Sequence, residues 1–266
     1  MRRVAFTLIE LLVVITTIVL LMAIFTPCLQ SSKMRARTVL CGSNIKQLSL
    51  ALALYETENK TLPFSFHDSF VPPPGGYPGG LGYDRMGWWW FNYITEYSKK
   101  DKGKRSVLQC PSKNLRNPKL KNNILCGNYG VNQSICKSLS GRKSWAEFKF
   151  IGKPLSTTDL PHPSQSLLVV DSGYSMINWW HAADTPPVSL SNIIIEDTAY
   201  IPGLKINEEK LLWPGQERDA IEGRHPNKTV NVGFADGHII RTKATKLLVE
   251  KNADGYKNRS SLWQPD

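Results

Sequence analysis

The chain begins with a long apolar segment that contains one acidic residue. The positions from Phe6 to Phe25 are mostly apolar, and Glu10 carries the only charge between Val4 and Pro27. About 20 residues in a helix span roughly 30 Å, which is the thickness of a bilayer core. The segment is not followed by the small-x-small cleavage site of a secretory signal peptide. The pattern therefore predicts a membrane-spanning helix, and a carboxylate inside such a helix usually marks a function.

A one-sided apolar stripe follows this segment. Apolar residues recur at spacings of three and four at Cys41, Ile45, Leu48, Leu52 and Tyr55. This spacing is typical of an amphipathic helix. We expect one helix over residues 6–58, with a transmembrane first half (6–25) and a second half that packs its stripe on a globular head.

Residues 59–266 show strand and turn patterns but no repeat and no second domain. SQSLLVVDSG is typical of a buried strand that ends at Asp171, and SVLQCPSKN of a short strand that runs into a turn. In TVNVGFADGHIIRTK, apolar side chains alternate from Val230 to Phe234 before Asp236-Gly237, a favoured two-residue turn, which predicts a hairpin. The sequence therefore indicates an α+β protein, in which the long helix packs on a small, mostly antiparallel sheet in one head domain.

Composition narrows the function only a little. The net charge of +11 suits nucleic acid, anionic lipid or an acidic polysaccharide equally well. The chain lacks the G-x-S-x-G, H-E-x-x-H, P-loop and paired-carboxylate patterns, so we do not expect an enzyme. Binding of DNA would rest on charge alone, so nucleic acid is not expected as a partner.

The N-terminal sequence AFTLIELLVVI resembles the leader junction of type IV pilins and type II secretion pseudopilins. In that superfamily a prepilin peptidase cuts before a Phe and methylates the new amine, and an acidic residue lies four positions after the Phe. The resemblance implies a leader peptide of residues 1–5, cleavage between Ala5 and Phe6, and N-methylation of Phe6. Most members have Gly where this chain has Ala5. Pro27, twenty-one residues after Phe6, matches a proline that many members carry and that loosens the helix.

The same resemblance implies a role for Glu10 in assembly. In a helical filament, Glu10 would pair with the Phe6 amine of a neighbouring copy, which lowers the cost of holding both charges in an apolar core. The assembly platform of a type II secretion or type IV pilus system would build this filament. Before assembly, the chain would cross a bacterial inner membrane once, with its head in the periplasm, and afterwards it would be part of a periplasmic or cell-surface filament. In the alternative, Glu10 reaches the lipid headgroups in a simple membrane anchor.

The head also carries a resemblance. RHPNKTVNVGFADGH resembles the H-x9-DG segment of a group of pilin-like proteins, with His225, Asp236 and Gly237 at the motif positions. The segments CGSNIKQLSLALALYETENKTLPFS, LQCPS, NYGVN and LWQPD are similar to that group as well. Here ten residues, not nine, separate His225 from Asp236.

Metal and disulfide chemistry is weakly indicated. His225, Asp236 and His238 lie on or beside the predicted hairpin, and two histidines with a carboxylate suit a divalent metal. Neighbouring strand positions face opposite sides, however, and Asp in an Asp-Gly turn commonly serves the backbone, so we assign no metal there.

Secretion-type major pseudopilins carry calcium in a C-terminal loop, where this chain has Asp254 and Asp266, but these are few ligands for calcium. No cofactor is therefore expected. Cys126 and Cys136 flank a short span that a disulfide would close outside the cytoplasm, and buried reduced thiols are the equal alternative.

The tandem tryptophans Trp88, Trp89 and Trp90 suggest a second function. Three consecutive tryptophans do not all face one core, and exposed ones would stack on sugar rings. With the basic charge, they suggest a surface-anchored module that binds an anionic polysaccharide. In the structural alternative, two of them lie in the core and one covers the surface.

Overall fold

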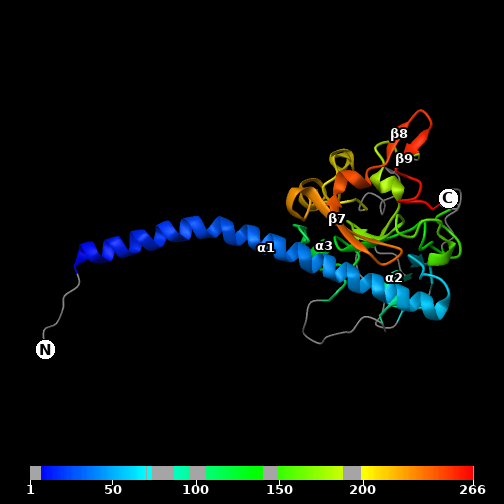
Figure 1. The fold of residues 1–266 in the computed structure, drawn as a ribbon, viewed down its shortest axis with the longest axis horizontal. Helices are drawn as coiled ribbons and strands as arrows, with labels where there is room; N and C mark the ends of the chain where they lie inside the picture. Colours follow the sequence, from blue (N-terminus) through cyan, green and yellow to red (C-terminus); the bar gives the residue numbers. More distant parts are fainter. Residues whose placement is uncertain are drawn as a thin grey trace.

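The longest element is one helix that joins an exposed N-terminal half to the head. The computed structural model describes residues 7–69, 71–73, 87–95, 106–139, 149–187 and 199–265. Helix α1 (Leu8–Asn59) is continuous, and Figure 1 shows its first half projecting away from the head. It ends at Lys60, which has a left-handed backbone (φ 65°) and donates its N–H to the carbonyl of Glu56. The prediction of one long helix over residues 6–58 agrees with this element.

Pro27 lies inside α1 without ending it. A proline has no N–H, so it removes one helical hydrogen bond at this point. Figure 1 shows that α1 curves gently and stays one helix.

The second half of α1 packs on the head through the predicted stripe. Cys41, Ile45, Leu48 and Leu52 have no exposed surface, and Tyr55 is half-buried. The stripe contacts the central sheet, mostly at one strand, β6 (Thr229–Phe234).

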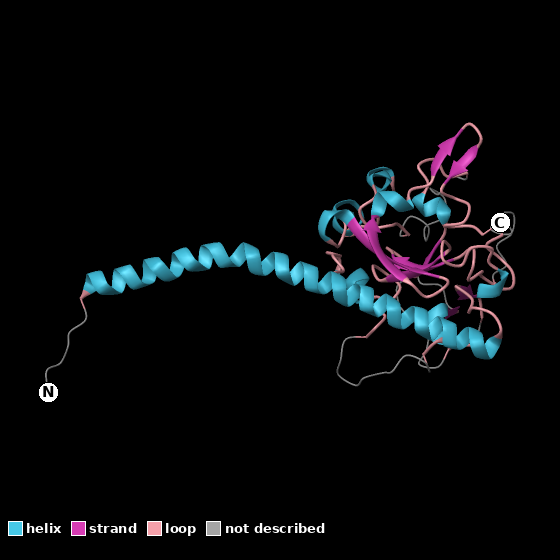
Figure 2. Cartoon of the chain, viewed as in Figure 1, coloured by secondary structure: helices cyan, strands magenta, loops and turns pink. Residues whose placement is uncertain are grey.

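The head is built around a mixed sheet of five strands, in the order β5-β3-β4-β6-β7. The other four strands are β3 (Tyr129–Asn132), β4 (Leu167–Asp171), β5 (Met176–Ile177) and β7 (Ile239–Lys243). Three neighbouring pairs are antiparallel and β3–β5 is parallel. Figure 2 shows α1 on one side of this sheet and several short helices on the other. The α+β class is confirmed, and so are the buried strand that ends at Asp171 and the hairpin that β6 and β7 form.

The hairpin turn lies one residue earlier than predicted. The N–H of Gly237 donates to the carbonyl of Phe234 (2.9 Å), so Ala235 and Asp236 are the central residues of the turn. Gly237 follows with φ +86°, the left-handed residue that longer hairpin loops require. The prediction of an Asp236-Gly237 two-residue turn was therefore wrong in register.

Smaller elements complete the head. Two short antiparallel pairs join β1 (Phe66–His67) to β2 (Trp88–Trp89) and β8 (Glu250–Asn252) to β9 (Gly255–Lys257). The short helices are α2 (Trp90–Tyr93), α3 (Pro118–Asn122), η1 (Thr157–Asp159), η2 (Trp179–Ala182), η4 (Lys205–Glu209), the π-helical η5 (Arg218–Glu222), η6 (Pro226–Lys228) and η7 (Ala244–Leu247).

The strand predicted for SVLQCPSKN is absent, and this segment forms turns instead. Ser106 organises the first turn, because its hydroxyl accepts from the N–H of Leu108 and its carbonyl from the N–H of Gln109. A serine that binds the backbone locally competes with strand pairing.

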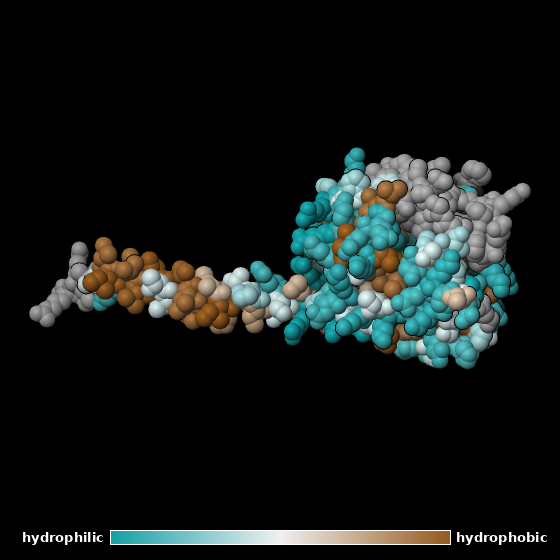
Figure 3. All heavy atoms as spheres, turned by 90° about the horizontal axis from the view of Figure 1, so that it is seen from above, coloured by the Kyte–Doolittle hydropathy of each residue, from teal (hydrophilic) through white to brown (hydrophobic). Residues whose placement is uncertain are grey.

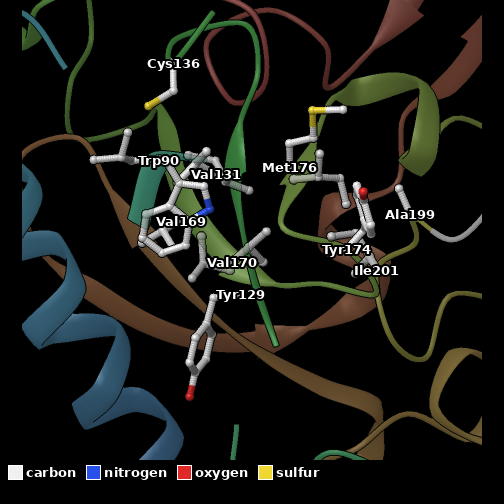
Figure 4. Close-up of a cluster of buried hydrophobic side chains, with 14 of the residues drawn as sticks. Trp90, Tyr129, Val131, Cys136, Val169, Val170, Tyr174, Met176, Ala199 and Ile201 are labelled. Carbon is white, nitrogen blue, oxygen red and sulfur yellow. The ribbon is translucent and has the colours of Figure 1, made fainter. Parts of the chain in front are cut away.

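The core surrounds the central strands. Figure 4 shows buried side chains of β3 and β4, among them Val131 and Val169, together with Trp90. The indole N–H of Trp90 donates to the carbonyl of Ser175 (2.8 Å). Both faces of β4 are buried, which explains its unbroken apolar sequence.

His181 in η2 makes the stability of the head depend on pH. It is 3% exposed, and its Nδ1 accepts from the N–H of Asn178 (3.1 Å). Burial, and then the charge of Lys210, lower the pKa of His181 from 6.5 to about 3. Between these values the unfolded chain binds a proton that the folded chain does not, so the free energy of unfolding should fall as the pH falls.

We expect this loss to reach about 1.4 kcal/mol per pH unit between pH 6.5 and 3. Urea denaturation of the detergent-solubilised chain at a series of pH values measures it. His181→Gln should flatten the profile in this window, whereas His162→Gln, at an exposed histidine, should not. Equal profiles for the parent and His181→Gln would contradict the prediction.

Candidate functional site

Four metal-binding side chains from distant segments meet beneath α1. Cys41 comes from α1, Cys110 from the turns after residue 106, Asp171 from the end of β4 and His225 from the segment after η5. All four are buried, and their ligand atoms lie within 4.8 Å of one another. Among the described residues, this is the only such group of three or more Cys, His, Asp or Glu side chains. We call these four residues the buried cluster.

The contacts inside the buried cluster are short. The two sulfur atoms of Cys41 and Cys110 are 3.7 Å apart. Cys41 Sγ lies 3.0 Å from Asp171 Oδ1, and His225 Nε2 lies 3.1 Å from Asp171 Oδ2. Asp171 is thus the centre of the group, with one carboxylate oxygen toward a thiol and the other toward the imidazole.

Thr38, one turn before Cys41 on α1, fixes the orientation of the His225 ring. Its hydroxyl donates to the carbonyl of Met34 (2.9 Å) and lies 3.2 Å from His225 Nδ1. Since the only hydroxyl hydrogen is engaged, Thr38 accepts from an Nδ1–H of His225. The other nitrogen, Nε2, therefore faces the carboxylate of Asp171.

Arg224 and Asp219 form a buried ion pair beside the cluster. Arg224 Nη2 lies 2.6 Å from Asp219 Oδ2, and both side chains are inaccessible to solvent. The guanidinium also donates to the carbonyls of Asn128 (2.8 Å) and Ser172 (2.9 Å), and Nη1 lies 3.9 Å from Asp171 Oδ1. Arg224 thus supplies positive charge to two buried carboxylates.

The electrostatics of Asp171 and His225 are coupled. Burial raises the pKa of Asp171, but the charge and hydrogen bond of His225 and the charge of Arg224 outweigh it, so that this pKa is lowered. Burial lowers the pKa of His225, but the charge and hydrogen bond of Asp171 overcome this effect and raise it to about 9. The protonated form of His225 is therefore favoured beside the carboxylate of Asp171.

The two thiols differ. Burial raises the pKa of Cys41 well above its ordinary value, and the neighbouring Cys110 and Asp171 raise it further. Burial also opposes ionisation of Cys110, but hydrogen bonds with Cys41 and His225 lower its pKa to about 6. Cys110 is therefore the sulfur of the pair that ionises more readily.

The sequence contained each member of the buried cluster but did not bring them together. It placed Cys41 in the apolar stripe, Asp171 at a strand end and His225 in the H-x-DG-like segment. Asp219 and Arg224 were missed. Their only signal was the position of Arg224 directly before His225.

His225 does not share a site with Asp236 and His238. His225 is buried at Asp171, whereas Asp236 and His238 pair in the exposed hairpin loop, with Nδ1 and Oδ1 2.6 Å apart. The ring of His238 stacks on Phe234, with centroids 4.3 Å apart. The sequence assigned no metal to these three residues, and the structure separates His225 from the other two because the chain turns into the core at His225 before it enters the hairpin.

Two of the three tandem tryptophans are buried in the head. Trp89 and Trp90 are at most 1% exposed and belong to the core. Trp88 is half-buried, and its indole N–H donates to the carbonyl of Val71 (2.8 Å). Trp89 and Trp90 are therefore not among the exposed tryptophans that would stack on a glycan, and the arrangement is the structural alternative of two core residues and one at the surface.

The remaining predicted ligands are scattered. Asp254 is exposed in the turn between β8 and β9, and Asp266 lies outside the described residues. Cys126 and Cys136 are both buried free thiols, which is the second of the two alternatives that the sequence left open.

The N-terminal end of α1 gives Glu10 a local partner. Its carboxylate accepts from the N–H of Thr7 (2.8 Å) and from its hydroxyl (2.7 Å), while the Thr7 hydroxyl accepts from the N–H of Glu10 (3.2 Å). This reciprocal arrangement is a capping box, which stabilises the first turn of a helix. Ala5 and Phe6 lie outside the described residues.

The first half of α1 is apolar and wholly exposed. Exposed side chains surround the helix axis from Leu8 (81%) to Phe25 (66%). Figure 3 shows them as a brown band along the N-terminal half of α1, whereas hydrophilic residues dominate the visible face of the head. By length and composition, α1 can cross a membrane.

No family model, curated protein or solved structure matches this chain.

Proposed function

We propose that the chain is a pilin-like subunit, processed by a prepilin peptidase before Phe6 and assembled into a type II secretion or type IV pilus-like filament. The observation that carries this proposal is the two-part character of α1. One continuous helix is apolar all round in its first half and one-sided in its second, where it packs on the head.

A helix that is apolar on every side requires an apolar environment on every side. A bilayer supplies it before assembly, and the first halves of neighbouring copies supply it in a filament. The rigid connection of this half to the sheet then carries each head to the outside of the filament. The basic head would lie in the periplasm or at the cell surface.

Glu10 fits this proposal because its carboxylate lies at the N-terminal end of the apolar half. Cleavage before Phe6 would leave a cationic amine one residue before Thr7, the N-cap residue of α1. The Glu10 carboxylate of one copy would pair with this amine on a neighbour. That pairing competes with the capping box for the same Glu10 carboxylate. The role of Glu10 in charge pairing and its role in capping the helix must therefore be tested with different variants.

We expect Glu10→Gln to abolish filaments while insertion and cleavage remain. Gln also suits the third position of a capping box, so this variant keeps the cap and removes the charge. Thr7→Ala is the matched control, because it weakens the cap by about 0.5–2 kcal/mol and keeps the charge. Electron microscopy of sheared filaments, with mass spectrometry of the N-terminus, measures both steps.

Normal filaments from Glu10→Gln would exclude the charge pairing. Loss of filaments from Thr7→Ala alone would show that Glu10 acts as a cap. An intact Met1 in cells with and without the peptidase would overturn the whole assignment.

A further inference from the structure

We propose that the buried cluster binds one zinc ion, which ties α1 to the head. This inference does not depend on the filament proposal, because it concerns residues of the head and of the packed half of α1. The argument rests on the identity of the donors, their spacing, their surroundings and their charge.

The donor set suits zinc. Two thiolates, an imidazole and a carboxylate are the ligand types of zinc sites, whereas calcium and magnesium prefer oxygen alone. Structural zinc sites have four protein ligands and no open position, and four buried side chains meet here.

The spacing of the sulfur atoms agrees with tetrahedral geometry. Two thiolates at a Zn–S distance of about 2.3 Å, separated by the tetrahedral angle, lie about 3.8 Å apart. The observed separation of Cys41 Sγ and Cys110 Sγ is 3.7 Å. A disulfide requires about 2.05 Å, so the pair is spaced as co-ligands and not as a bonded pair.

The surroundings of His225 prepare its Nε2 for a metal. Thr38 accepts from Nδ1–H, which directs Nε2 toward a carboxylate oxygen of Asp171 at 3.1 Å. A proton on Nε2 satisfies this contact without a metal, and a zinc ion would replace that proton and bind the Nε2 lone pair. Metal-binding histidines are commonly fixed by such a hydrogen bond on the second ring nitrogen.

A zinc ion would cancel most of the buried negative charge. Two thiolates, Asp171 and Asp219 carry four negative charges, and zinc together with the guanidinium of Arg224 supplies three positive ones. Arg224 lies 2.6 Å from Asp219 Oδ2 and 3.9 Å from Asp171 Oδ1. Asn231 holds the carboxylate in place, since its N–H donates to Asp171 Oδ2 (2.7 Å).

A zinc ion here would join segments that are far apart in the chain. Cys41 belongs to α1, while the other three ligands come from a turn segment, the end of β4 and the segment after η5. All four ligands are buried, so the ion would be structural and would fasten the helix to the head.

The experiment measures zinc in the full chain, purified in detergent with a non-thiol reductant and loaded with zinc. We expect about one zinc ion per chain after extensive dialysis. Cobalt in its place should give the visible absorption of a tetrahedral thiolate site. Cys41→Ser and Cys110→Ser should lose the retained zinc, whereas Cys136→Ser, at a buried thiol outside the cluster, should keep it.

A second variant tests the positioning role of Thr38. Thr38→Val removes the acceptor for Nδ1–H and should weaken zinc affinity about 10–100-fold, measured by competition with a chromophoric chelator. Thr57→Val is the matched control, because Thr57 makes the same backward bond to a helix carbonyl but is exposed.

Three results would overturn the proposal. The first is a parent chain that retains no zinc. The second is adventitious binding, in which Cys41→Ser and Cys110→Ser retain as much zinc as the parent. The third is a disulfide between Cys41 and Cys110, found by mass spectrometry in protein alkylated directly on isolation.

Discussion

Replacing Arg224 by methionine is expected to destabilise the head by about 3–5 kcal/mol, because it leaves Asp219 buried without its cation and removes one of the two positive charges near Asp171. Arg224 pairs with Asp219 at 2.6 Å, and the side chains of Arg224, Asp219 and Asp171 are all inaccessible to solvent. Methionine fills much of the volume but supplies no charge and no donors to the carbonyls of Asn128 and Ser172.

Urea denaturation of the full chain in detergent, with a chelator present to remove any contribution from metal, measures this loss. Arg218→Met is the matched control. Arg218 pairs with Glu222 at 3.0 Å, but its side chain is 49% exposed, so its loss should cost at most about 0.5 kcal/mol. A similar, small loss in both variants would show that Arg224 does not hold the site together.

The partner of the pair offers a second check. Asp219 also accepts from the N–H of Asn114 (3.0 Å) and from the hydroxyl of Tyr200 (3.0 Å). Arg224→Met combined with Asp219→Asn should cost clearly less than the sum of the two single variants, since the second change removes one of the charges that the first exposes.

The sequence predicted those parts of the fold that depend on local patterns. The apolar segment and the stripe from Cys41 to Tyr55 follow the helical period, so one long helix could be expected. The apolar alternation from Val230 to Phe234 follows the strand period of two and predicted the hairpin. The apolar run before Asp171 predicted the central strand.

The parts that the sequence missed depend on contacts between distant residues. Thr38 and His225 are 187 positions apart, and Cys41 and Asp171 are 130 apart. No periodicity links such residues. The parallel pairing of β3 and β5 was likewise not predicted, because strands of four and two residues carry little pattern.

The burial of the tryptophans distinguishes between the two interpretations of this segment, which were exposed rings for glycan stacking and two core residues with one at the surface. The tandem Trp88, Trp89 and Trp90 suggested that at least one is exposed, because three consecutive tryptophans were not expected to face one core. In the structure the chain changes from β2 to α2 between Trp89 and Trp90, which allows both side chains to enter the core. A change of backbone geometry within a tandem motif is not visible in its composition.

The interface between α1 and the sheet depends on one glycine that no local pattern marked. A Cβ atom at Gly233 in β6 would lie 2.8 Å from Ser49 Oγ, 2.8 Å from Val169 Cγ1 and 2.9 Å from Ile45 Cγ2. These distances are shorter than real contacts allow, so the helix approaches the sheet this closely only because the position has no side chain.

We expect Gly233→Val to cost at least about 3 kcal/mol, since three more carbon atoms enter a packed interface between a helix and two strands. Gly233→Ala should cost about 1–3 kcal/mol, and Ser49→Ala should recover part of that loss, because it removes the Oγ that the new Cβ would meet at 2.8 Å. Urea denaturation measures each variant.

Gly42→Ala is the matched control on the helix side of the same interface. Its Cβ would meet Asn231 Oδ1 at 3.4 Å, and the gain in helix propensity of about 1 kcal/mol offsets a small rearrangement. If Gly233→Val were as stable as the parent, α1 would be free to move away from β6, and one continuous helix could not hold the head rigidly to the apolar half. If Gly233→Val is destabilised and Gly42→Ala is not, the close approach of α1 to β6 is what holds the helix rigidly to the head.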